Sequence, residues 1–146
     1  MNGRRIRGAI GIVIGSLCLA LPAFALDPGQ PAAVVTPIIS ATETAAGQPI
    51  VLPQTDVRVI ASRFEIAPGA ALPVHKHPYQ RYAYVLAGTL EVTDIESGES
   101  TIYKAGDFIV EVVDRWHRGK NVGADKVELI VVDQVSGDVQ QTILRK

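Results

Sequence analysis

The chain has 146 residues, 14 of them basic and 15 acidic, which gives a formal net charge of −1. Three of the basic residues, Arg4, Arg5 and Arg7, lie near the start, and the remaining sequence carries 11 basic against 15 acidic residues. No basic stripe is left, so the composition argues against nucleic acid or an anionic membrane surface as a partner.

The first 25 residues have the three parts of a secretory signal peptide. A basic start is followed by the apolar run 9–21 and then by Pro22-Ala23-Phe24-Ala25, which ends in the Ala-x-Ala pattern that signal peptidases read. The apolar run is shorter than the roughly 20 residues that cross a bilayer. We therefore expect cleavage after Ala25, export to the periplasm or out of the cell, and no stable membrane insertion of the mature chain.

The expected mature chain, residues 26–146, has the size of one domain. The single cysteine, Cys18, falls in the signal peptide, so the mature domain has neither a disulfide nor a thiolate ligand or nucleophile. Residues 26–50 are rich in Pro, Ala, Thr and Gly and are predicted to form an N-terminal arm or linker. Within it, the apolar pairs Val34-Val35 and Ile38-Ile39 are expected to pack in part as an edge strand.

From residue 51 onward the sequence predicts an all-β domain, 51–146. Short β-rich segments alternate with turn signals such as Pro68-Gly69 and Ala105-Gly106. The segments are 57–66, 82–93, 101–104, 107–113, 126–133 and 140–144. Strands of this length and spacing indicate an antiparallel sandwich or barrel, and no long amphipathic helix is expected after the signal peptide.

The chain contains three histidines, His75, His77 and His117. Residues two apart in a strand point to the same face, so His75 and His77 present two imidazoles side by side. Imidazole suits divalent zinc, copper, iron and nickel, whereas manganese is usually accompanied by carboxylates. On its own, an HxH pair is more often two polar residues at the end of a strand, so the spacing around it decides.

That spacing resembles the two motifs of the cupin superfamily, G-x5-H-x-H-x(3,4)-E-x6-G and G-x5-P-x-G-x2-H-x3-N. The matching positions are Gly69, His75, His77 and Gly88 for the first motif and Gly106, His117 and Asn121 for the second. Val112 and Asp114 stand where the second motif has Pro and Gly. The resemblance covers roughly residues 57–132, and the two motifs together use every histidine in the chain.

The resemblance implies a single jelly-roll β-barrel of two antiparallel sheets. It also implies that His75, His77 and His117 converge inside the barrel on one divalent transition metal, namely Fe, Mn, Zn, Ni or Cu. The glutamate that usually completes the site falls on Arg81. A guanidinium is always charged and offers only donors, so it cannot ligate a cation.

Arg81 leaves three alternatives open. In the first, the three histidines hold the metal, and Arg81 binds a carboxylate or other anion that belongs to a small substrate. In the second, another side chain fills the vacant position: either Gln80, one residue out of register, or Glu111, expected on the strand of His117 with the same parity. In the third, no metal is bound, and the barrel is a pocket for a small anion or polar ligand.

Tyr79, beside the HxH pair, is the candidate acid–base residue, whereas Tyr82 and Tyr84 are more typical of packing. The sequence therefore predicts an exported, metal-binding barrel that binds or converts a small organic molecule. Oxygenase, isomerase and lyase chemistry are all compatible with it. The alternative is a metal-free, non-catalytic periplasmic barrel that binds or senses a small ligand. The arm and the exposed aromatic residues also permit a homodimer through strand exchange.

Overall fold

The computed structural model describes residues 33–146, of which Thr36–Lys146 form one compact unit. The predicted signal peptide, 1–25, and the start of the predicted arm, 26–32, lie outside the described residues. Within 33–146 there is no helix long and apolar enough to span a membrane. The strands are β1 (Val57–Ile66), β2 (His75–Lys76), β3 (Arg81–Ala87), β4 (Thr89–Asp94), β5 (Ser100–Lys104), β6 (Phe108–Val110), β7 (His117–Asn121), β8 (Val127–Ser136) and β9 (Ile143–Leu144).

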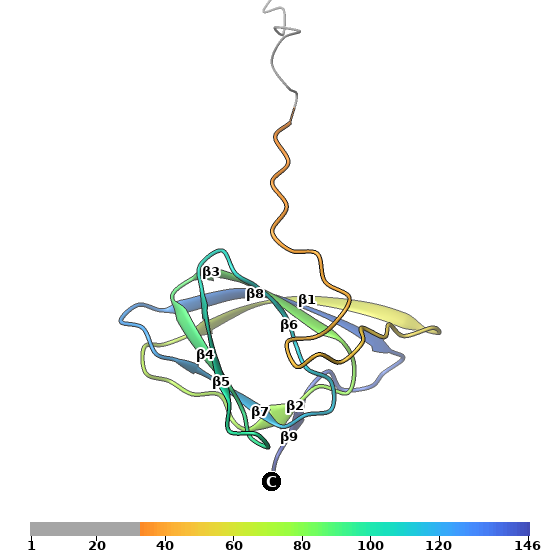
Figure 1. Ribbon diagram of the computed structural model, residues 1–146. Helices are drawn as coiled ribbons and strands as arrows, with labels where there is room; N and C mark the ends of the chain where they lie inside the picture. Colours follow the sequence, from red (N-terminus) through yellow and green to blue (C-terminus); the bar gives the residue numbers. More distant parts are fainter. Residues whose placement is uncertain (1–32) are drawn as a thin grey trace, which may run out of the picture. The chain divides into compact units, whose positions relative to one another are not determined.

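Two antiparallel sheets make up the domain. One sheet has the strand order β1-β8-β3-β6, and the other has the order β5-β4-β7-β2-β9. Figure 1 shows β1, β8 and β3 on one side of the barrel and β7, β2 and β9 on the opposite side. The structure therefore confirms the predicted all-β fold of two antiparallel sheets.

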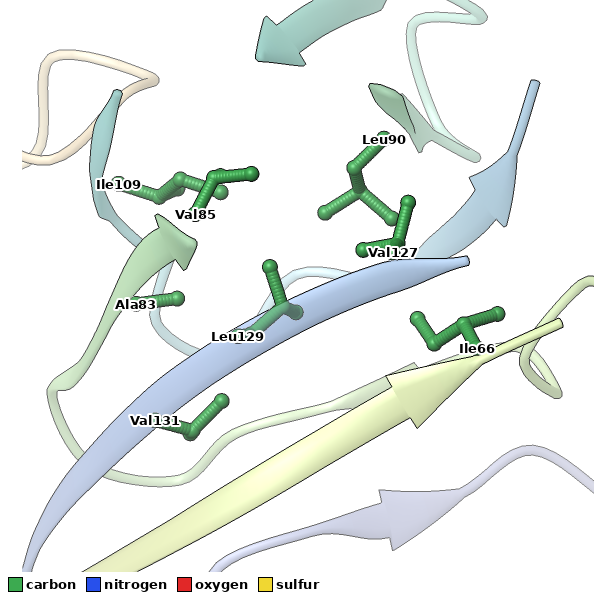
Figure 2. Packing of buried hydrophobic residues seen from close by; sticks show 8 residues of the cluster. All are labelled: Ile66, Ala83, Val85, Leu90, Ile109, Val127, Leu129 and Val131. Atoms are coloured by element: carbon green, nitrogen blue, oxygen red, sulfur yellow. The ribbon is translucent and has the colours of Figure 1, made fainter. Parts of the chain in front are cut away.

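An apolar cluster fills one end of the space between the sheets. Along β8, Val127, Leu129 and Val131 are buried, and Figure 2 shows the three side chains rising from the same face of the strand. The other members of the cluster are Ile66, Ala83, Val85, Leu90 and Ile109. Each large apolar side chain buried here contributes about 1.5–3 kcal/mol, so this cluster holds the two sheets together.

The same alternation leads β8 from the apolar end of the barrel to a polar end. The next inward residue after Val131 is Asp133, which is 3% exposed. On the neighbouring strand β3, Arg81 lies directly opposite Asp133 and is 5% exposed. The interior is thus apolar near Val127 and charged near Asp133.

Gly88 divides the segment predicted as one strand over 82–93. It takes a positive φ of 82°, a conformation that L-residues with side chains rarely adopt. The chain leaves the four-stranded sheet at the end of β3 and enters the five-stranded sheet at the start of β4. The single predicted strand is therefore two strands on opposite walls.

Other strand predictions differ at the ends. The segments predicted over 107–113 and 140–144 are strands only over Phe108–Val110 and Ile143–Leu144. Strand β7 was not among the predicted segments. Its sequence, HRGKN, has two charged residues and a glycine, and its inward positions are His117, Gly119 and Asn121. A strand whose buried face is polar lacks the apolar alternation on which the prediction relied.

The edge strand predicted within the arm does not form in the described part of the arm. Val34 and Ile38 are 84% and 60% exposed and lie in no strand. Pro37, close by, lacks the N–H group that a strand ladder needs. Farther along, the Gln48 side chain attaches the arm to the barrel, because its amide donates to the carbonyl of Val113 and accepts from the N–H of Val113.

Candidate metal centre

The three histidines meet at the polar end of the barrel. His75 on β2 lies directly opposite His117 on β7, and His77 follows His75 by two residues, so all three rings face inward. Their exposed fractions are 6%, 0% and 3% for His75, His77 and His117. One nitrogen of each ring can be chosen so that the three atoms lie within 4.8 Å of one another. The three rings therefore form a group that could hold one metal ion.

Backbone carbonyls fix which nitrogen of each ring faces the cavity. The Nδ1 atoms of His75, His77 and His117 lie 2.7, 2.8 and 2.9 Å from carbonyl oxygens. The carbonyls belong to Pro73, Gln141 and Arg115, in that order. A carbonyl oxygen only accepts, so each Nδ1 carries the hydrogen and donates it. In the neutral rings, the three Nε2 lone pairs are left for the interior, which is the arrangement of metal-ligating histidine.

Glu111 adds a carboxylate to the same point. Its Oε2 lies 3.2 Å from the Nε2 of His77 and 3.2 Å from the Nε2 of His117. The prediction that Glu111 lies on the same strand as His117 was wrong. Glu111 follows β6, whereas His117 is on β7. The backbone N–H of Glu111 donates to the carbonyl of Arg81 at 3.0 Å, which fixes the residue beside the end of β3.

These groups are electron-rich and require a cation between them. Burial raises the pKa of the Glu111 carboxyl, but its contacts with His117 and His77 outweigh burial and bring that pKa well below the usual range. Burial alone would lower the pKa of His117, but the contact with Glu111 has the larger effect, so the pKa of His117 is raised. The buried Nε2 of His117 makes no hydrogen bond with any described residue. A proton on His117 or a metal ion would satisfy this arrangement, so the residues fit a bound divalent metal.

Arg81 is held by a carboxylate of the protein itself. Its Nε donates to Asp133 Oδ1 at 2.7 Å and its Nη2 to Asp133 Oδ2 at 3.1 Å. Nη2 also donates to the Thr142 hydroxyl at 3.0 Å, and Nη1 lies 3.3 Å from the Nε2 of His77. Arg81 therefore faces the centre as the motif implies, but the anion it binds is Asp133. No substrate carboxylate is needed to neutralise it.

Gln80 and Tyr79 lie outside the ring of histidines. The Gln80 side chain is fully buried, and its amide nitrogen donates to the carbonyls of Arg81 and Glu111, both at 3.0 Å. Gln80 thus supports the backbone around Glu111. Tyr79 lines a separate surface pocket that includes Pro53 and Pro78, and it is not among the residues that line the cavity at the histidines.

Three participants were not predicted. The sequence did contain a signal for Asp133. On the inward face of β8 it follows three apolar residues, Val127, Leu129 and Val131. A charged side chain on an otherwise apolar buried face requires a partner. Thr142 and Gln141 had no such signal. Gln141 contributes only its carbonyl oxygen, a group that every residue has.

Two cavities border the centre. The inner one, about 30 Å³, is lined by His75, His117, Arg81 and Glu111 among others; a water molecule needs roughly 10–15 Å³ measured in this way. A second cavity of about 180 Å³ also has His117 in its lining. There the guanidinium of Arg115 pairs with the carboxylate of Asp94 at 2.7 Å. His117 and Val92 thus line both the inner space and the larger outer one.

Comparison with known proteins agrees with this architecture. The family model described as "Cupin domain" matches residues 62–133. No curated protein sequence is similar enough to the chain to count as a relative.

Solved structures show the same fold. The polyketide cyclase RemF from Streptomyces resistomycificus is 17% identical with a TM-score of 0.52, over 67% of this chain and 70% of that one. The oxalate decarboxylase of Lactobacillus farciminis, solved as a formate complex, is 23% identical with a TM-score of 0.50, over 59% of this chain and 26% of that one. The oxalate decarboxylase of Bacillus subtilis, studied for its Mn(II) centres, is 20% identical with a TM-score of 0.50, over 59% and 23%. The chain therefore spans about a quarter of the length of either decarboxylase.

Proposed function

The chain belongs to the cupin superfamily, and from this premise we propose that it binds one divalent transition metal and acts on or binds a small organic molecule. His75, His77 and His117 would hold the metal. The observation that carries the proposal is the set of three Nδ1–carbonyl contacts. Those contacts leave three buried lone pairs facing one another, which one divalent ion would satisfy together.

The donor set suits Fe, Mn, Zn, Ni or Cu rather than magnesium or calcium, because imidazole predominates over oxygen ligands. When bound, such an ion polarises an oxygen-containing group or activates a water molecule. The chain itself contributes the remaining functions. Three backbone carbonyls orient the rings, Glu111 supplies negative charge, and the apolar cluster around Leu129 excludes water from the opposite end of the barrel.

The small molecule would bind in the cavity of about 180 Å³ next to His117. Its lining includes Asp94, Glu99 and Arg115. Because Arg115 pairs with Asp94, Glu99 leaves the wall with an excess of negative charge. Arg81, the cation expected to bind a substrate carboxylate, already pairs with Asp133. We therefore expect a neutral or cationic polar ligand rather than a carboxylate.

Metal analysis of protein purified without added metal or chelator tests the function. Near-stoichiometric transition metal is expected in the wild type and loss of that metal in His75→Ala. Lys120→Ala, an exposed change on β7, serves as the matched control and should retain it. Wild-type protein that contains no metal, and takes up none on reconstitution, would refute the proposal.

One contact favours the alternative function, a metal-free binding or sensing barrel. Arg81 Nη1 lies 3.3 Å from the Nε2 of His77, where it can donate to the lone pair that a metal would otherwise use. In a metal-free barrel this donor would permanently satisfy His77. Titration of chelator-treated protein with Zn²⁺ separates the two functions, because the alternative predicts no saturable binding.

We also propose that residues 1–25 direct export and are removed. The basic start, apolar run and Ala-x-Ala end of this segment support it. Expression of the full chain in a bacterial host, followed by cell fractionation and N-terminal sequencing, should give a periplasmic product that begins at Leu26. A full-length product in the cytoplasm would contradict this.

A further inference from the structure

We infer that Glu111 is the fourth protein ligand of the metal and that Arg81 and Asp133 form a self-neutralising pair at the position where the first motif has its glutamate. This inference rests on the proposed function. It assigns a specific ligand set to the centre: three imidazoles and a carboxylate that enters from the end of β6 instead of from β3.

The distances from Glu111 to His77 and His117 are those of ligands on one ion. Two atoms that each lie about 2.1 Å from an ion, at tetrahedral or octahedral angles, are about 3.0–3.4 Å apart. Glu111 Oε2 is 3.2 Å from the Nε2 of His77 and 3.2 Å from that of His117. Both imidazoles already donate through Nδ1 to carbonyls. A lone pair facing a carboxylate oxygen at this distance is repulsive unless a proton or a metal ion lies between them, and a metal ion would satisfy both histidines together.

The backbone holds Glu111 at this point. Its N–H donates to the carbonyl of Arg81, and its own carbonyl accepts from the buried Gln80 amide, both at 3.0 Å. The residues at the motif's glutamate position therefore still position a carboxylate at the centre. They do so through the main-chain carbonyl of Arg81 and the side-chain amide of Gln80 rather than with a carboxylate of their own.

The charges of the centre also balance. Three neutral imidazoles contribute nothing, Arg81 and Asp133 cancel, and Glu111 contributes one negative charge. That is the same charge as three histidines with the motif's own glutamate. The pair on adjacent strands is bidentate and buried, with exposed fractions of 5% and 3% for Arg81 and Asp133, so the guanidinium charge is offset where it would otherwise repel the ion.

Metal titrations of chelator-treated protein test the ligand assignment. Glu111→Gln keeps the size of the side chain and removes its charge; we expect at least a 10-fold loss of Zn²⁺ affinity and an altered visible spectrum of the Co²⁺ form. Glu96→Gln, on an exposed turn, is the matched control and should leave both unchanged. A crystal structure of Zn²⁺-loaded wild type reports the ligand set directly if the variant fails to fold.

Substitutions at the pair test the charge balance. Asp133→Asn leaves the guanidinium uncompensated and should weaken Zn²⁺ binding at least 10-fold. The double change Arg81→Met with Asp133→Leu removes both charges and should restore affinity to within about 3-fold of wild type, since charge pairs act together. Failure of the double variant to restore binding would overturn the role of the pair.

The outcomes separate this inference from the proposed function. If wild type binds Zn²⁺ and Glu111→Gln binds it equally, with an unchanged Co²⁺ spectrum, Glu111 is not a ligand although the metal centre stands. If wild type binds neither ion, the metal function itself fails.

Discussion

His75 and His117 differ in how their surroundings act on their charge. Burial is the largest effect and lowers its pKa from 6.5 to about 4, while the Pro73 carbonyl opposes the shift and the neighbouring His117 and His77 add to it. His75 is therefore neutral at neutral pH even without a metal. His117, in contact with Glu111, has its pKa raised instead.

The stability of the metal-free protein should fall as the pH decreases from about 6.5 to 4.5. In this range the unfolded chain protonates His75 whereas the folded chain resists protonation until about pH 4, so the unfolded state binds more protons and is favoured. The full shift corresponds to a loss on the order of 3 kcal/mol. The raised pKa of His117 does not offset this loss of stability. A group with a raised pKa contributes its full stabilisation below its unfolded-state pKa of 6.5, so the contribution of His117 stays nearly constant over this pH range. The depressed pKa of Glu111 costs stability only at lower pH, once the unfolded carboxyl protonates.

Urea unfolding of chelator-treated protein at pH 6.5 and 4.5 measures this slope. His75→Gln removes the titrating group and should show a smaller decrease than wild type over the same interval. Equal decreases in the two proteins would mean that His75 is not the group responsible.

Metal uptake should release a proton from the site. The ligating nitrogen must be unprotonated, and the raised pKa of His117 favours a proton there in the metal-free state. Calorimetric titration with Zn²⁺ at pH 7 in buffers of different ionisation enthalpy should give a heat that depends on the buffer. A heat that is independent of the buffer would contradict a protonated His117.

At the scale of elements, the connection between β3 and β4 determines how the two sheets join. A Cβ on Gly88 would lie 2.7 Å from the carbonyl oxygen of Lys126 and 2.8 Å from the Cα of Val127. Both are backbone atoms at the start of β8, the strand that carries much of the core, so they cannot move without displacing it. The left-handed φ of Gly88 adds conformational strain to any side chain.

Gly88→Ala should destabilise the domain by about 3 kcal/mol or more, from strain and backbone collision together. Gly98→Ala is the matched control, because Gly98 also has a positive φ of 75° but a Cβ there would meet nothing within 4 Å. That control should cost only about 1 kcal/mol. Chemical denaturation of the two variants gives the comparison, and equal losses would show that close packing at Gly88 is unimportant.

The strands were predictable where a β-rich run is bounded by turn signals. Residues 57–66 and most of β8 are such runs, and the sequence predicts them with nearly correct limits. Strand β7 was missed as a segment because its inward face is His117, Gly119 and Asn121. These residues belong to the polar end of the barrel, where the physical signal of a buried strand is absent.

At the scale of the whole molecule, the centre connects strands from both ends of the domain. The sequence alone groups the three histidines, because the spacing of the two motifs implies that His75, His77 and His117 converge on one point. Glu111 was grouped with them for an incorrect reason, and Asp133 was overlooked although the alternation of β8 marks it. The role of the Gln141 carbonyl could not be predicted from the sequence. Every residue has a main-chain carbonyl, and only the fold determines which of them lies beside His77.

A bound metal should therefore stabilise the entire domain. At a free metal concentration 100 times the dissociation constant, binding adds about 2.7 kcal/mol, or roughly 10 °C in melting temperature for a domain of this size. Thermal melts followed by circular dichroism, with Zn²⁺ and with a chelator, should differ by this amount. His75→Ala should melt at one temperature in both conditions, and a wild type insensitive to the chelator would contradict the expectation.

The carbonyl that orients His77 is 64 residues farther along the chain, and the carboxylate that neutralises Arg81 is 52 residues farther than the arginine. Synthesis proceeds from the N-terminus, so a nascent chain presents His75 and His77 long before the partners that orient the site exist. During that interval an ion would meet only two loosely held imidazoles. Selective loading of the proposed metal would thus be deferred until β8 and β9 have joined the barrel, and the ion acquired would be one available where folding finishes.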